Sequence, residues 1–218
     1  MVRNRLLKLP NLQFLLRLRL SLQRFFMRTT LRYPSRSKLD MIIAKSESMP
    51  FSYQAVGATK KHPPKGYDFD QNKKRIGLGF FAFKTAKQAY EDWQMFNLGW
   101  VRIYRNNTKI KTGQNVVVSF RLLGLWWHNT CEIVYTIDTP TSFGFAYGTK
   151  YHVESGEELF LLRIDEEQTV WYEITAFSRP KFWLAKLFYP MSRKFQRQFV
   201  RQSSEQMEAA IKSKHGKI

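Results

Sequence analysis

The chain has 218 residues, of which 44% are hydrophobic and 16% aromatic, which excludes a disordered chain and suffices for one substantial domain. A single cysteine, Cys131, excludes a disulfide framework and any zinc site built from several cysteines. The net charge of +19 lies mostly at the ends, with +10 in residues 1–39 and +7 in residues 181–218. Because a nucleic-acid surface usually carries its Lys and Arg on the body, we do not expect a nucleic-acid partner.

Residues 1–37 form a basic N-terminal extension. On a helical projection of residues 11–28, arginines gather on a narrow strip, and Leu and Phe cover most of the remaining surface. This pattern is typical of an organelle transit peptide and of a helix lying in a membrane interface. We expect a mitochondrial, plastid or membrane-peripheral location, or a cytoplasmic one if the extension is an artefact of an upstream start codon. The residues expected to contact an anionic membrane surface are Arg17, Arg24 and Arg28.

Residues 38–212 are expected to form one domain, with a tail at 213–218. Its first half mixes short elements: aromatic residues at helical spacing between Phe83 and Phe96 predict one helix, and a stretch rich in Pro and Gly predicts a loop. In chain order we expect a helix at Lys38–Lys45, an irregular loop at Phe51–Lys74, a strand at Arg75–Phe81 and a helix at Ala82–Phe96.

The second half changes to a period of two, which is typical of half-buried strands joined by hairpins. After Pro180 the period returns to 3.6, and it predicts a helix over 182–211 that is kinked or restarted at Pro190. Its apolar stripe contains Phe188, Met191, Phe195 and Phe199. The strands are expected at 116–122, 131–137, 143–147, Leu159–Ile164 and Val170–Phe177.

This order predicts the α+β class, with a curved antiparallel sheet wrapped on a long C-terminal helix. That helix-grip architecture buries both apolar surfaces and often leaves a cavity between them. Gly144 and Gly148 lie opposite the aromatic residues of their strand and are expected to let the sheet bend.

Several ordered strings resemble an uncharacterised bacterial and plant family known as domain of unknown function nineteen-ninety. They are PFSYQAVGAT (50–59), MFNLGW (95–100), GFAYGT (144–149), ESGEE (154–158), VWYEITAFSRP (170–180) and YP (189–190). The resemblance covers about residues 38–210. It implies a START-like, helix-grip fold of the kind that binds hydrophobic ligands, and it implies no catalytic residues.

The leading hypothesis for function is a non-enzymatic binding module for a hydrophobic small molecule or lipid, with no cofactor, and a membrane surface is one place where we expect it to act. Aromatic residues of the sheet and helices are expected to line its cavity, although aromatic residues at these spacings also fill ordinary cores. Arg179 is expected to bind an anionic head group or to form an ion pair with Glu173, the latter being the preferred interpretation. The expected ligand-binding residues are Tyr90, Trp93, Tyr135, Phe145, Tyr147, Trp171, Arg179 and Phe195.

Two other functions remain open. The first is a membrane-associated or organelle-targeted scaffold. The second is an enzyme that acts on a hydrophobic substrate through His152 and nearby carboxylates, because His152 and Glu154 share a strand face and are weak candidates for a metal. The preferred interpretation is a polar hairpin that turns at Ser155-Gly156, with its flanking acids solvated, and therefore no metal site.

Two further features have structural and functional interpretations. Cys131 is expected to be a small core residue, because His128, three residues away on a strand, faces the opposite side and cannot act as its base. The run Trp126–Asn129 is expected between two strands, where paired Trp side chains either enter a membrane interface, close a cavity mouth or pack on the body.

Overall fold

The structure, a computed structural model, describes residues 29–62, 64–106, 109–151, 154–180 and 189–215. In this part of the chain eight strands form one sheet, accompanied by three α-helices and two short 3-10 helices. In chain order they are β1 (Thr29–Thr30), α2 (Arg36–Glu47), η1 (Ala58–Lys60), β2 (Asp68–Leu78), α3 (Gly79–Glu91), η2 (Gln94–Phe96), β3 (Val101–Tyr104), β4 (Asn115–Leu122), β5 (Leu125–Asp138), β6 (Ser142–Tyr151), β7 (Glu154–Ile164), β8 (Thr169–Pro180) and α5 (Tyr189–His215).

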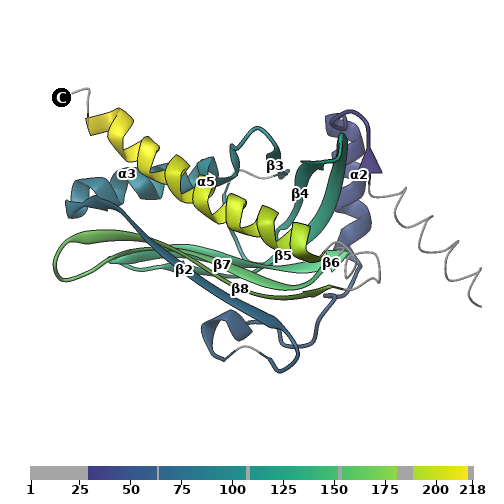
Figure 1. Cartoon of the computed structure of the whole chain (residues 1–218), viewed down its shortest axis with the longest axis horizontal. Coiled ribbons are helices and arrows are strands. Elements are labelled where there is room, and N and C mark those ends of the chain that lie inside the picture. The colour runs from purple at the N-terminus through teal and green to yellow at the C-terminus, as the bar shows by residue number, and fades with distance from the viewer. Residues whose placement is uncertain (1–28, 63, 107–108, 152–153, 181–188, 216–218) are drawn as a thin grey trace, which may run out of the picture.

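The sheet is antiparallel, with the spatial order β2-β8-β7-β6-β5-β4-β3 and with β1 paired to β5. Helix α5 crosses one face on a diagonal, and α3 packs beside it (Figure 1). We call this the inner face; Ile133, Phe145 and Phe160 are among its core residues. The opposite, outer face carries Val117 and Ala146, and α2 covers it at β4 and β5. The predicted curved sheet on a long C-terminal helix is therefore confirmed.

The first predicted elements form with shifted boundaries. Helix α2 extends the expected Lys38–Lys45 by two residues at each end, and Ser35 Oγ caps it by accepting the backbone N–H of Lys38 at 3.4 Å. Strand β2 begins at Asp68, inside the predicted loop. Its charged residues hide it from a search for alternating apolar residues, but they suit its position at the edge of the sheet.

Helix α5 is described from Tyr189 to His215, and residues 182–188 of the predicted helix, including Phe188, lie outside the described part of the chain. Pro190 is the second described residue of α5, and the helix runs on from it to His215, so the predicted kink or restart at Pro190 stays a prediction. Met207 and Ile211 are buried against the inner face, whereas Phe195 and Phe199 are half-buried. The helix thus packs most tightly through its C-terminal half.

A β-bulge in β5 changes which side chains share a face. Ile133 pairs with Tyr147 of β6, but Tyr135 pairs with Ala146, so Val134 is the extra residue. The alternation therefore slips by one, and Tyr135 lies on the outer face instead of following Cys131 and Ile133 inward. The predicted alternation through residue 137 is wrong for this reason.

The Trp126–Asn129 run lies within strand β5 and not between strands, so its predicted loop position is wrong. The turn lies just before it, at Leu123 and Gly124, which both have positive φ angles, of 51° and 80°. Consecutive positive φ values match the two-residue hairpin turn, which usually shows Asn-Gly or Asp-Gly. Leucine at the first position removes that signal from the sequence.

The outer face holds a buried carboxylate that fastens an irregular segment to the sheet. Glu157 of β7 is 2% exposed and accepts hydrogen bonds from Tyr53 Oη and Gly57 N, both at 2.7 Å, and from Thr59 N at 3.1 Å. The Thr59 hydroxyl donates to the same carboxylate. Four donors satisfy the buried charge. The predicted turn at Ser155-Gly156 is wrong, since both residues pair with β8, and so is the prediction that the flanking acids are all solvated.

A second buried polar group of the outer face is His128. Its Nε2 lies 2.9 Å from Thr30 Oγ1 of β1, and its Nδ1 lies 2.9 Å from Ser119 Oγ of β4. Burial, with a smaller contribution from the charge of Lys38, lowers the pKa of His128 to about 4. The imidazole is therefore neutral near pH 7, with one ring nitrogen donating and the other accepting.

The low pKa of His128 predicts how stability changes with pH. In the unfolded chain the imidazole binds a proton near pH 6.5, but in the folded protein only near pH 4, so protonation favours unfolding as the pH falls between these values. We expect His128→Gln to remove about 2–3 kcal/mol of the stability lost between pH 7 and pH 4. Urea unfolding of both proteins across this range measures the difference, and parallel stability–pH curves would contradict the expectation.

Candidate functional site

Four of the predicted ligand-binding residues converge on the inner face, where they fill a packed core. Tyr90 is fully buried, and its ring centroid lies 5.5 Å from that of Phe143 and 5.7 Å from that of Phe145. Trp93 packs on Phe145 at 4.8 Å, and Tyr147 lies 6.3 Å from Phe145. These edge and tilted contacts are typical of aromatic packing. Their ligand-binding role stays a prediction.

The structure separates three other predicted residues from this group. Tyr135 faces outward and lies 2.8 Å from Thr59 Oγ1 through its hydroxyl. Trp171, which also faces outward by strand alternation, donates to Asp165 Oδ2 at 2.6 Å. Arg179 places its guanidinium over the ring of Tyr67 at 4.5 Å. None of the three shares a space with the residues under α5.

The ion pair expected between Arg179 and Glu173 is not among the contacts of the described residues. Glu173 instead lies 2.9 Å from Arg163 and 3.8 Å from Lys73, which sit on the strands on either side of it. The register explains this, because Glu173 is directly opposite Lys73 on β2, six residues away from Arg179 along its own strand.

The inner face is less tightly covered at β3, β4 and β5, under the N-terminal half of α5. Phe195, the eighth predicted residue, is half-buried there and lies 5.7 Å from Trp100. Trp100 also donates from Nε1 to Gln202 Oε1 at 2.6 Å, which ties this region to α5. We call the group the aromatic end of the inner face. Its half-buried apolar side chains are Trp100, Ile103, Val118, Phe120, Trp127, Phe195 and Phe199.

A buried amide lies in the middle of the aromatic end. Asn129 alternates on β5 with Trp127 and Cys131, so its side chain faces inward beside Val118, its partner on β4. It is 1% exposed, yet neither Oδ1 nor Nδ2 has a hydrogen-bond partner among the described residues. Sequence reasoning missed this residue, because its position in the assumed loop concealed that it belongs to a strand.

Glu158 brings a carboxylate to the same face, further along the sheet. Tyr147 Oη donates to Glu158 Oε2 at 2.6 Å, and burial together with this charge raises the pKa of Tyr147 well above 10. Burial is also the main cause that raises the pKa of the Cys131 thiol. Cys131 is 1% exposed and His128 faces outward, so the prediction of a small core cysteine is confirmed.

The remaining predicted sites fall largely outside the described chain. His152 is outside it, and Glu154 is placed only as a backbone position that pairs with Pro180. Arg17, Arg24 and Arg28 are outside it as well, so membrane contact and localisation stay predictions. Within the described ranges no three metal-ligating side chains gather, and no helix is long and apolar enough to span a membrane.

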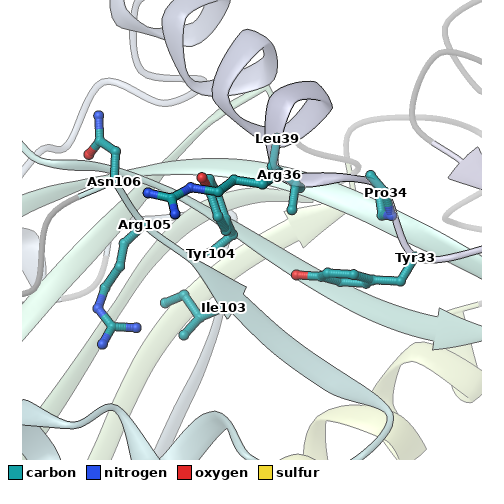
Figure 2. Close-up of a pocket in the computed structure, with 8 residues that line it drawn as sticks. All are labelled: Tyr33, Pro34, Arg36, Leu39, Ile103, Tyr104, Arg105 and Asn106. Atoms are coloured by element: carbon teal, nitrogen blue, oxygen red, sulfur yellow. The ribbon is translucent and has the colours of Figure 1, made fainter.

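A surface pocket lies at the β3 edge of the sheet, where the segment before α2 passes close to it. Its cavity volume is about 460 Å³, and Tyr33 and Arg36 approach it from one side while Ile103 and Arg105 extend from the strand on the other (Figure 2). The lining residues are Tyr33, Pro34, Arg36, Leu39, Ile103, Tyr104, Arg105 and Asn106. Acidic side chains are absent from this lining.

A curved antiparallel sheet closed over a C-terminal helix, with a partly covered inner face, defines the helix-grip, START-like class. Residues 52–206 match the family described as "Domain of unknown function (DUF1990)", and the chain belongs to this family. The resemblance stated from the sequence strings is thereby confirmed.

Relatives agree with the family assignment, and a solved structure agrees with the fold. The chain is 33% identical over 205 residues to a UPF0548 protein of Dictyostelium discoideum, covering 84% of this chain and 95% of that one. It is 30% identical over 147 residues to a UPF0548 protein of Arabidopsis thaliana, covering 64% and 71%. A hypothetical protein from Helicobacter pylori has a similar crystal structure, with a TM-score of 0.54, 13% identity, and coverage of 74% and 98%.

Proposed function

We propose that this protein is a binding module for a hydrophobic small molecule or lipid, held between the aromatic end of the inner face and the N-terminal half of α5. The observation that carries the proposal is the unpartnered amide of Asn129, which is buried among aromatic and aliphatic side chains. Buried polar groups in folded proteins nearly always have a hydrogen-bond partner. A bound ligand supplies one here.

The chemistry of the amide limits the class of ligand. Asn129 presents one acceptor and two donor hydrogens, so it pairs with a hydroxyl, a carbonyl or an amide on the ligand. The nearby rings of Phe120 and Trp127 suit an apolar body, and they are stacked with an interplanar angle of 2°. The ligand that fits is therefore largely apolar and carries a neutral polar group.

Replacing Asn129 by leucine tests the proposal through two opposite effects. In protein freed of small molecules by refolding from urea, Asn129→Leu is expected to raise the free energy of unfolding by about 1–2 kcal/mol, because an unpaired buried amide is removed. Its affinity for prodan, an uncharged naphthalene that carries a ketone, is expected to fall at least about tenfold, because the ketone loses its donor.

The matched control is Asn72→Leu, which changes an exposed amide on β2. We expect it to leave both the prodan affinity and the urea midpoint close to those of the parent protein. If Asn129→Leu instead lowers stability and leaves prodan binding unchanged, Asn129 has a structural role and the proposed binding site is wrong.

A further inference from the structure

We propose that the pocket at the β3 edge is a second binding site, which recognises a carboxylate or phosphate group carried on an apolar body. The pocket shares Ile103 with the aromatic end, but the proposal does not rest on the ligand assigned to the inner face. Its basis is a cavity of about 460 Å³, a volume within the usual range for small-molecule sites. The charged residues of its lining are two arginines, Arg36 and Arg105.

Arg105 lines the pocket and is half-buried, and the charge of Asp92 also acts on its guanidinium. Its Nε is buried without a hydrogen-bond partner among the described residues, while its guanidinium carbon lies 5.5 Å from the centroid of the Trp93 ring. Contact with that ring holds the side chain and covers part of the charge from water. A guanidinium offers paired N–H donors that match the two oxygens of a carboxylate or phosphate.

Arg36, on the opposite side of the pocket, adds a second positive charge. Arg36 is the first residue of α2, where the positive end of the helix also favours an anion. Asp40 is not a lining residue, but its carboxylate accepts a hydrogen bond at 2.7 Å from Tyr104 Oη, which is in the lining. Figure 2 shows the Tyr33 hydroxyl pointing toward the space between Arg36 and Ile103.

The apolar part of the lining explains why the ligand has a body and is not a bare ion. Pro34 and Leu39 are buried and contribute apolar lining on the outer-face side together with the ring of Tyr33, and half-buried Ile103 contributes it from β3. Arg36 is exposed and Arg105 is half-buried, so the attraction for an anion is screened less by water at Arg105. A ligand that fills both parts is an amphipathic anion.

The test uses calorimetric titration of the full chain with four probes: sodium decanoate and decyl phosphate below their critical micelle concentrations, 1-decanol below its solubility limit, and inorganic phosphate. Decanoate and decyl phosphate are expected to bind, and 1-decanol and inorganic phosphate each at least about tenfold more weakly, because each lacks one half of the recognised ligand. Inorganic phosphate binding as tightly as decyl phosphate would overturn the proposal.

Variants then locate the bound anion. Arg36→Gln and Arg105→Gln are each expected to weaken decyl phosphate at least about tenfold. Arg201→Gln, which removes an exposed arginine of α5, is expected to change the affinity less than about twofold. Unchanged affinity in both pocket variants overturns the proposal, as does a loss in Asn129→Leu with Arg36→Gln unaffected, which would place the anion on the inner face.

Discussion

Replacing Glu157 by alanine is expected to lower the free energy of unfolding by about 3–5 kcal/mol, because several buried donors lose their acceptor together. The Tyr53 hydroxyl and the backbone N–H of Thr59 belong to buried residues, and the Gly57 N–H is partly buried. Urea unfolding measures the loss. Amide hydrogen exchange at Gly57 and Thr59 is expected to speed up more than exchange in α5, since segment 51–60, which Glu157 holds to the sheet, detaches first.

Glu205→Ala is the matched control. Glu205 is an exposed carboxylate on α5 that pairs with Arg201 at 3.0 Å, so its removal is expected to cost less than about 1 kcal/mol. Equal losses for the two variants would show that the hydrogen bonds at Glu157 do not hold segment 51–60 to the sheet.

Phe160→Ala is expected to cost about 3–5 kcal/mol, because the side chain is completely buried where the sheet, η2 and α5 meet. Its ring centroid lies 5.3 Å from that of Phe96 and 6.1 Å from that of Phe199. Thermal and urea unfolding both report the change.

Phe195→Ala provides the contrast on the helix itself. Phe195 is half-buried, so its truncation leaves less of a cavity and is expected to cost about 1–2 kcal/mol. If Phe195→Ala proves as costly as Phe160→Ala, the N-terminal half of α5 packs as tightly as the core, and the aromatic end has no room for a ligand.

The sequence predicted the architecture well because its main elements are periodic. The stripe on α5 and the alternation of β4, β6, β7 and β8 each specify a buried face, and one arrangement buries them all. The predictions failed where a local device interrupts the period. The extra residue at Val134 turns Tyr135 outward, and a Leu–Gly turn at Leu123 replaces the expected turn residues.

The candidate sites were harder to predict, because each depends on contacts between distant segments. Glu157 looked like a solvated acid beside a turn, yet its donors come from residues about 100 positions earlier in the chain. The isolation of Asn129 becomes visible only when its strand neighbours are known. Likewise, Arg36 and Arg105 are far apart in sequence and line one pocket because α2 packs on the outer face at β4, the strand next to β3.

Native mass spectrometry of the purified full chain tests the central claim most directly. The parent protein and Asn72→Leu are expected to retain a bound uncharged small molecule or to take up prodan one to one, whereas Asn129→Leu is expected to do neither while remaining folded. An adduct that persists undiminished in Asn129→Leu, or a parent protein that neither retains a molecule nor binds prodan, would contradict the account of this protein as a ligand-binding helix-grip module.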